Sequence, residues 1–251
     1  MGETFKTIKF LSLLLIIFAS FNTSYASTDN IEKARTLFLE GKYLKAIEVC
    51  KSLNTLQSLI LQSRIISIYT YFYIKNDTAQ KEYLKSYEIA KKAIEIDNSN
   101  AEGYVEAAHS LGRYGQQIGI ISAISMGIAD RVKNYLVTAL SLDNQNVIAN
   151  ISIGIWHAEI INQAGKTIGR AIYGAKKNKA RYYFKKAYEL NNNQIGILYE
   201  LAYGYYLLGE KDDTEKSKKL ISKLLIMENY AHMDSLYKIK AENLKKKLKF
   251  Y

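Results

Sequence analysis

Few residues of this sequence have the types and spacing that catalysis or metal binding requires. Its three histidines, His109, His157 and His232, are too dispersed to give a metal-ligand spacing. Glu106 would share a helix face with His109, and Asp234 lies near His232, but such pairs are typical of surface contacts. We therefore expect no catalytic residue, no metal and no cofactor, and a protein that is not an enzyme.

A phosphate-binding loop is also excluded. Gly165-Lys166-Thr167 has the ending of such a loop, but the glycine required five residues earlier is Ile160. No predicted strand precedes the segment, and the HExxH, CxxC, GxSxG and GxGxxG patterns do not occur in the sequence. Nothing in these motifs indicates a nucleotide or a zinc site.

Cys50 is the only cysteine, so the chain cannot form an intramolecular disulfide and its fold must hold by packing. The neighbours Ile47, Val49 and Leu53 are apolar. This setting predicts a small buried side chain and not a reactive thiol.

The N-terminus has the pattern of a secretory signal. Lys6 and Lys9 precede an apolar run from Phe10 to Phe18, and Ser24-Tyr25-Ala26 places small residues before a cleavage site after Ala26. We expect residues 1–26 to be a signal peptide and 27–251 to be one exported domain, with the periplasm as its location. Retention of the segment as an uncleaved anchor is the alternative. No cysteine lies near the junction, which argues against a lipoprotein.

The charge is strongly basic, with a formal net value of +11. Residues 166–186 hold eight basic and no acidic side chains, and residues 211–251 hold eleven lysines against six acidic residues. These stretches are either solvated helix faces or surfaces that attract anionic lipid or an envelope polymer. An exported protein would rarely meet nucleic acid, so we expect none as a partner.

The elements that position these residues are predicted to be helices. The sequence of 251 residues has no proline, where about 12 would be usual, and 48% of it is hydrophobic. Three segments repeat as small–apolar–polar–apolar–Asp/Asn–Asn, each typical of a last helical turn that runs into a tight turn. These segments are Ala93–Asn98, Ala139–Asn144 and Ala187–Asn192.

This pattern resembles the tetratricopeptide repeat (TPR), whose second helix ends A-L-E-L-D-P, with Asn98, Asn144 and Asn192 at the proline position. The segment from Ala34 through Gly41-Lys42-Tyr43 to Ala46 looks like a further repeat. The spacing of the turns exceeds the usual 34 residues of a repeat. The extra residues, Gly112–Asp130 and Gln163–Lys177, are placed between the two helices of their hairpins.

The resemblance implies an all-α fold, a TPR-like helical-hairpin solenoid with extended central hairpins. The combination of an export signal and lengthened hairpins is similar to a group of exported bacterial TPR proteins. It is distantly similar to the regulator-of-microtubule-dynamics family and to the T component of tripartite periplasmic transporters, although the lipid-attachment cysteine of the latter is missing. The expected helices are 29–40, 43–54, 56–74, 78–96, 101–127 with a break, 129–142, 147–172 with a break, 176–190, 195–209, 213–227 and 231–249.

One of these helices is open to an alternative interpretation. The helix over Leu56–Ile74 is apolar enough for a membrane span, but Gln62, Ser63 and Arg64 interrupt it, so a buried first helix of a hairpin is favoured. Aspartates 77, 130 and 213 are predicted N-terminal caps.

In the TPR family, fixed positions of each first helix line a concave groove. Transferred to this sequence, those positions predict a groove with a polar end, an aliphatic floor and a tyrosine-lined end. The candidate binding residues are Glu102, His109, Arg113, Glu159, Tyr199, Tyr203 and Tyr206, with Val105, Ile148, Ile151 and Ile155 beside them. The competing interpretation is that the inserted segments pack into the groove and make these residues part of the core.

The sequence therefore predicts a non-enzymatic scaffold of the bacterial envelope that holds a protein or peptide partner in its groove. One alternative is an accessory of solute or lipid handling, with an apolar cavity formed by the inserts. Another is an envelope hydrolase based on His109, His157 and nearby carboxylates.

Overall fold

The computed structural model describes residues 30–249, apart from the side chains of Ile120, Ile121 and Ile168, and over that range it contains helices and turns but no strand. The predicted signal peptide, residues 1–26, lies outside the described residues and stays a prediction. Residues 30–39 form a first helical segment. The helices that follow it are α2 Tyr43–Leu53, α3 Leu56–Tyr73, α4 Asn76–Ile96, α5 Ala101–Ile118, α6 Ile120–Ser125, α7 Ile128–Leu142, α8 Val147–Ala164, α9 Lys166–Tyr173, α10 Lys177–Leu190, α11 Ile195–Leu208, α12 Lys211–Leu225 and α13 His232–Lys247.

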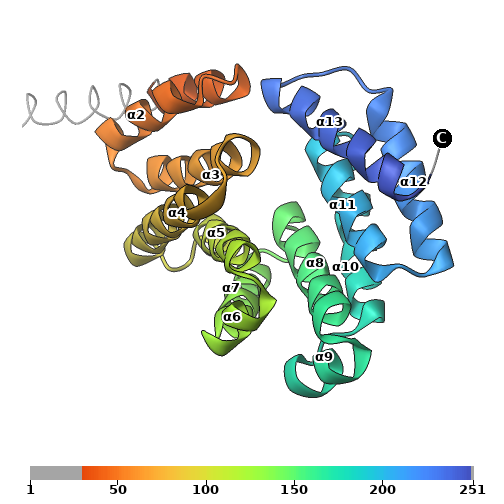
Figure 1. Ribbon diagram of the computed structural model, residues 1–251. Helices are drawn as coiled ribbons and strands as arrows, with labels where there is room; N and C mark the ends of the chain where they lie inside the picture. The colour runs from red at the N-terminus through yellow and green to blue at the C-terminus, as the bar shows by residue number, and fades with distance from the viewer. Residues whose placement is uncertain (1–29, 250–251) are drawn as a thin grey trace, which may run out of the picture.

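Consecutive helices pair as hairpins, as the repeat predicted. The pairs are α3 with α4, α5 with α7, α8 with α10, and α11 with α12, and each pair packs on the next. The hairpins follow one another around a ring, with α2 and α13 approaching each other where the ring closes (Figure 1). The predicted all-α repeat fold is confirmed.

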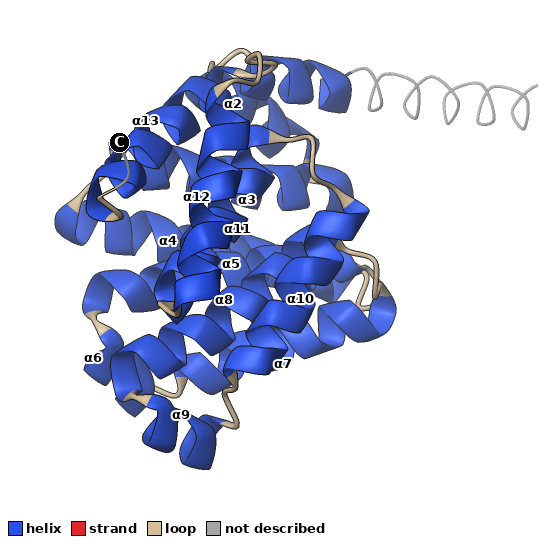
Figure 2. Ribbon diagram, turned by 90° about the vertical axis from the view of Figure 1, so that its right-hand side faces the viewer, coloured by secondary structure: helices blue, strands red, loops and turns tan. Residues whose placement is uncertain are grey.

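The two inserted segments form the short helices α6 and α9. The breaks that precede them are at Gly119 and Gly165, whose φ values of +84° and +80° are in the region that favours glycine. α6 contacts α5 and α7, and α9 contacts α8. Both lie at the same edge of the molecule in two perpendicular views (Figures 1 and 2). The inserts therefore lengthen their own hairpins at one edge.

Each repeated turn is closed by the Asp or Asn that precedes the predicted proline position. Its backbone N–H donates to the carbonyl of the recurring alanine four residues earlier, and its Oδ1 accepts the backbone N–H two residues later. The closing bonds thus come from the residue before Asn98, Asn144 and Asn192. The three sets are Ala93, Asp97 and Ser99; Ala139, Asp143 and Gln145; and Ala187, Asn191 and Asn193.

The predicted N-terminal caps are wrong. The aspartates lie inside the first turns of α4, α7 and α12, where a negative charge still favours the helix N-terminus. Side-chain caps are made instead by Thr55, Asn100 and Asn146, which start α3, α5 and α8. Asp213 is fully buried, and Arg181 compensates its charge by donating to both of its carboxylate oxygens, at 2.8 and 2.6 Å.

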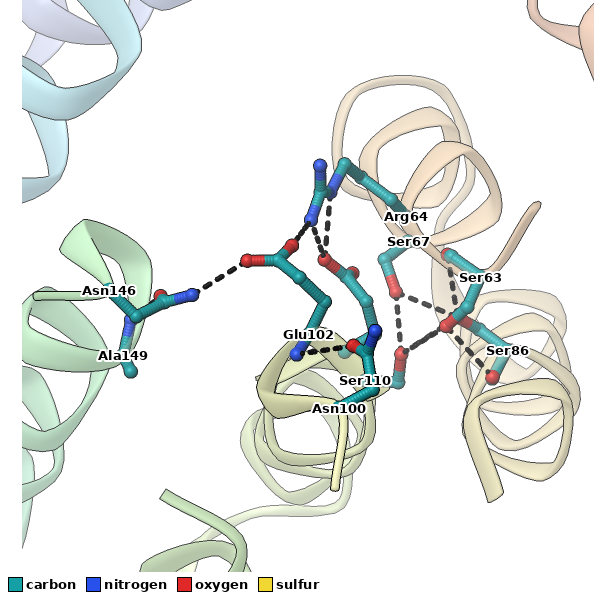
Figure 3. Close-up of polar contacts among 10 residues, drawn as sticks. Ser63, Arg64, Ser67, Ser86, Asn100, Glu102, Ser110, Asn146 and Ala149 are labelled. Carbon is teal, nitrogen blue, oxygen red and sulfur yellow. Dashed lines mark hydrogen bonds and ion pairs between the residues drawn. The ribbon is translucent and has the colours of Figure 1, made fainter. Parts of the chain in front are cut away.

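Helix α3 is the buried first helix of a hairpin. Its serines Ser63 and Ser67 form a hydroxyl network with Ser86 of α4 and Ser110 of α5, with Oγ–Oγ distances of 2.7 to 3.5 Å (Figure 3). Such small side chains let three helices approach closely while their polar groups stay bonded. Within residues 30–249, none of the helices combines the length and the apolar character that crossing a membrane requires.

The two ends of the repeat array are in contact. The ring of His232, at the start of α13, lies 6.1 Å from that of Tyr43 in α2, and its Nε2 is 3.1 Å from the Tyr73 hydroxyl of α3. A Cβ atom on Gly41 would lie 2.3 Å from the His232 ring, so only glycine fits there. Phe72 of α3 packs edge-on against Tyr237 of α13 at 5.1 Å. These contacts close the array into a ring.

Candidate functional site

A cavity of ≈ 760 Å³ occupies the centre of the ring, and we call it the central groove. Side chains from α3, α5, α7, α8, α11 and α13 border it. Ala123 of the first insert also borders it, but the inserts do not fill it. The groove is thus the concave side of the repeat fold.

One wall of the groove is polar and comes from α5. Glu106, His109, Arg113 and Gln116 border it and follow one another at intervals of three and four residues. Residues with that spacing lie on one helix face. The wall is therefore a single polar stripe along the helix.

A second wall is aliphatic and comes from α8. Ile148, Ile151 and Ile155 border the groove at the same helical spacing, with Glu159 one turn further on. Trp156 also borders it, but its ring is buried and its Nε1 donates to the Ala129 carbonyl at 2.9 Å. The two walls face one cavity, so the groove is amphipathic in cross-section.

Arg113 of α5 links this helix to α11 and α3. Its guanidinium donates to Glu200 Oε1 of α11 at 3.0 Å and to Gln116 Oε1 at 3.2 Å, and it lies 4.2 Å from the ring centre of Tyr71. The Arg113 and Glu200 side chains are only 12% and 16% exposed. Burial opposes the charge of Arg113, but Glu200 holds its pKa above the usual value. Lys240 of α13 lies 3.7 Å from the centre of the Tyr71 ring, and burial lowers its pKa.

Arg64 of α3 binds two carboxylates of α5 at one end of the groove. Its Nε donates to Glu106 Oε1 at 2.7 Å, and its Nη2 contacts both Glu106 and Glu102 (Figure 3). Asn146, the N-cap residue of α8, donates to Glu102 at 2.6 Å. Glu106 is 2% exposed, and its second oxygen, Oε2, has no hydrogen-bond partner among the described residues. Burial raises the Glu106 pKa, although the Arg64 charge opposes that shift.

His109 and Glu159 are also electrostatically perturbed. Burial, assisted by the charges of Arg113 and Arg64, lowers the His109 pKa to about 3, so its imidazole is neutral at ordinary pH. Burial raises the pKa of Glu159, while Gln116 stabilises its carboxylate through a 2.7 Å hydrogen bond to Oε1. Neither arrangement presents a nucleophile or a metal-ligand set.

Four of the seven predicted binding residues border the central groove, and the other three do not. His109, Arg113, Glu159 and Tyr203 border the central groove. Glu102 borders a smaller neighbouring pocket of ≈ 250 Å³ with Arg64. Tyr199 and Tyr206 are not among the described residues that border the groove: Tyr199 is buried against Tyr237, and Tyr206 packs on Tyr203.

Sequence reasoning missed two further groove residues on α5, Glu106 and Gln116. It also missed residues that the ring brings in from other helices: Glu200 borders the groove, while Tyr71 packs on Arg113 and Lys240 packs on Tyr71. Glu106 was interpreted with His109 as a surface pair, and that interpretation is wrong because the Glu106 side chain is buried. The sequence did contain a signal for a groove position, since Glu106 is one helical turn from both Glu102 and His109, which were assigned to the groove.

The other candidates for chemistry have structural roles in this fold. Asp234 accepts the backbone N–H groups of Tyr230 and Ala231 at the start of α13, while His232 is bonded to Tyr73. Burial raises the Cys50 pKa to about 11, as expected for a thiol that packs as an apolar group. Over the described part of the chain, no group of His, Cys, Asp and Glu side chains could hold a metal ion.

A solved structure with a similar arrangement of helices is a TPR protein. The chain is similar to TTC0263, a thermophilic TPR protein of Thermus thermophilus, with 14% identity and a TM-score of 0.59 over 86% of this chain and 97% of that chain. MamA of MSR-1 matches 78% of this chain and 94% of its own, with 13% identity and a TM-score of 0.42. At such low identity the similarity to TTC0263 shows the fold alone. The similarity to MamA has too low a TM-score to support any argument.

No curated protein sequence matches the chain. The family model described as regulator of microtubule dynamics protein 1-3 matches residues 30–249. That match spans every residue that the structure describes, from the first helical segment to the end of α13. The chain therefore belongs to the regulator of microtubule dynamics protein 1-3 family.

Proposed function

We propose that the protein is an interaction scaffold that holds a segment of a partner protein in the central groove. The observation that supports this most is the pairing of a polar wall on α5 with an aliphatic wall on α8 around an open cavity of ≈ 760 Å³. Partner helices and strands bind such grooves by placing apolar side chains on one wall and polar groups on the other. The proposal places the protein in the bacterial envelope, and the support for that location is the signal-like sequence at the N-terminus.

A photo-crosslinking experiment tests the groove as the binding surface. A photoreactive residue would replace Ser152, which borders the groove beside Ile151 and Ile155. The matched control would replace Lys185 on the outer helix α10, where the side chain is 76% exposed. Irradiation of cells that express the full chain should give discrete protein adducts at position 152 that are absent at position 185.

Two results would contradict the proposal. Adducts that are the same at both positions would mean that the groove is not a preferred surface. If position 152 gave no protein adduct and native mass spectrometry showed a co-purified small molecule, the groove would be a site for an apolar solute, since its aliphatic wall suits either occupant.

A further inference from the structure

We propose that the segment held in the central groove is amphipathic and basic, with a lysine or arginine side chain at the carboxylates Glu106 and Glu159 and aliphatic side chains on the α8 wall. This inference rests on the proposed scaffold function and names the chemistry of the partner. It follows from three properties of the groove: an unpartnered carboxylate oxygen, an acidic local charge and a polar wall with two defined ends.

The unpartnered oxygen is Glu106 Oε2. Arg64 binds only the other oxygen of this carboxylate, and Oε2 has no partner among the described residues although the side chain is 2% exposed and borders the groove. A buried acceptor left without a donor costs free energy, about 1–3 kcal/mol for a neutral group and more for a charged one. A donor group on a bound segment would remove that cost.

The local charge of the groove is opposite to that of the whole chain. Three carboxylates border it, those of Glu106, Glu159 and Glu200, against the two guanidinium groups of Arg64 and Arg113. Both guanidinium groups are already engaged, Arg64 by Glu102 and Glu106, and Arg113 by Glu200. Glu102 beside Arg64 and Lys240 beside Tyr71 add one charge of each sign, so with the carboxylates ionised the local excess is negative, in a protein whose formal net charge is +11.

Two hydrogen bonds between α5 and α8 lie at the two ends of the polar wall on α5, the first of them beside the smaller pocket that Glu102 borders. Asn146 joins the start of α8 to Glu102 at 2.6 Å, and Gln116 near the end of α5 joins Glu159 at 2.7 Å. From Glu102 to Gln116 the helix rises about 21 Å, at ~1.5 Å per residue. That length matches about 14 residues of a bound helix or about 6 of an extended strand.

Between these two bonds, the walls of the groove determine where the bound segment would carry basic and aliphatic side chains. The basic side chain would meet Glu106 at one end or Glu159 at the other, and Ile148, Ile151 and Ile155 would take the aliphatic side chains. An acidic segment would add like charges beside Glu106 and Glu159, which disfavours it. The groove therefore selects a basic segment, while the outer surface of the protein repels one.

The experiment uses the full chain and two labelled amphipathic peptides of about 14 residues, with leucines on one face and either lysines or glutamates on the other. Fluorescence anisotropy should show tighter binding of the lysine peptide, and the affinity should fall as salt is added. Non-specific attraction to a chain of net charge +11 would favour the glutamate peptide, so the preference reports the groove.

Variants locate the binding carboxylates. Glu106→Gln and Glu159→Gln should each weaken the lysine peptide about tenfold, because each removes one charge partner from a buried site. Glu189→Gln on the outer face of α10, where the carboxylate is 62% exposed, should leave the affinity unchanged. Thermal melts would verify that each variant folds. If Glu106→Gln does not fold, Glu159→Gln alone provides the test.

The inference is overturned if the glutamate peptide binds as tightly as the lysine peptide, or if both groove variants retain the affinity of the unmodified chain. If that happened while position 152 still gave protein adducts, the scaffold function would stand, but the bound segment would have a different chemistry. Absence of both adducts and peptide binding would remove the scaffold function itself.

Discussion

At the scale of single residues, the groove is a set of charges whose neighbours hold them in unusual states. His109 sits on α5 between Glu106 and Arg113, four residues from the latter, and both Arg113 and Arg64 disfavour its protonated form. The imidazole therefore contributes a neutral polar group beside two charged pairs. A proton on His109 would place a third positive charge in the same buried site.

This arrangement makes the stability of the protein depend on pH. The His109 pKa falls from 6.5 to about 3 on folding, so between these values the unfolded chain binds a proton that the folded chain does not. Stability should therefore decrease as the pH falls below 6.5, by up to ~1.4 kcal/mol per pH unit from this group. Urea denaturation of the full chain at about pH 7, 6 and 5 would measure this dependence.

The comparison that isolates His109 is the variant His109→Gln, which keeps a polar side chain of similar size without a titrating group. Its stability should fall less steeply with acid than that of the unmodified chain. Equal slopes would show that His109 does not remain neutral in the folded protein. Buried His157, whose pKa is lowered to about 4 mainly by burial, should give a separate and additive effect in His157→Gln.

The residues of the groove were predictable from sequence only where the repeat phase holds. His109 and Arg113 were found because their positions in the first helix match the family pattern. Val105 was expected beside them, but it is fully buried against Ala139 and Ala149, and Glu106 takes its place. Adjacent residues of a helix are rotated by about 100°, so a phase error of one residue exchanges core for groove.

At the scale of helices, close packing depends on glycines that face one aromatic ring. Phe184 of α10 is fully buried between Gly154 of α8 and Gly204 of α11. A Cβ atom on either glycine would lie 2.4 Å from the ring. The ring cannot move aside because it is enclosed, and it also packs on Tyr205 at 5.1 Å.

We expect Gly154→Ala and Gly204→Ala to lower the free energy of unfolding by about 1–3 kcal/mol each, since overpacking outweighs the better helix propensity of alanine. Gly112→Ala is the matched control, because the nearest atom to its new Cβ is 3.9 Å away on Val132. That substitution should be neutral or stabilising by up to ~1 kcal/mol. Chemical denaturation would measure all three, and equal effects at all three glycines would contradict the packing argument.

Most helix boundaries were predictable because their signals are local. The alanine-to-Asp/Asn turns end α4, α7 and α10, and Gly119 and Gly165 separate the inserts from the preceding helices. The caps were predicted less well. A run such as Lys211-Asp212-Asp213 offers several possible starts, and the choice between them depends on Arg181, which is distant in sequence.

At the scale of the whole molecule, the contact of His232 with the hairpin formed by residues 30–39 and α2 determines the shape. The residues involved are about 190 positions apart in the sequence, from Gly41 to His232. No periodic pattern carries information about such a contact, because each repeat specifies only how it packs on its neighbours. The closure of the ring, and with it the enclosure of the groove, was therefore not predictable.

A double-mutant cycle tests the closure. Gly41→Ala should destabilise the protein through its backbone, since φ is +79° there, and through collision with His232. In the His232→Ala background the ring atoms at 2.3 and 2.5 Å are gone and only the Cβ of residue 232, at 2.9 Å, remains close, so the same substitution should cost the backbone strain of about 1 kcal/mol and only a small part of the collision. The difference, measured by urea denaturation, should be a coupling of about 0.5–3 kcal/mol. Additive effects would show that the two ends are not in contact in solution.

The closed ring also fixes how many repeats this protein has. In an open array a repeat can be gained or lost with little effect on the others, and special end repeats shield the terminal apolar faces from water. Here α13 covers α2 and the end of α3, because His232 packs on Tyr43 and is hydrogen-bonded to Tyr73. Insertion or deletion of one hairpin would move α13 out of register with Gly41 and expose both ends at once. Members of the family that share this closure should therefore differ in the length of their hairpins, as the two inserts do here, and not in their number.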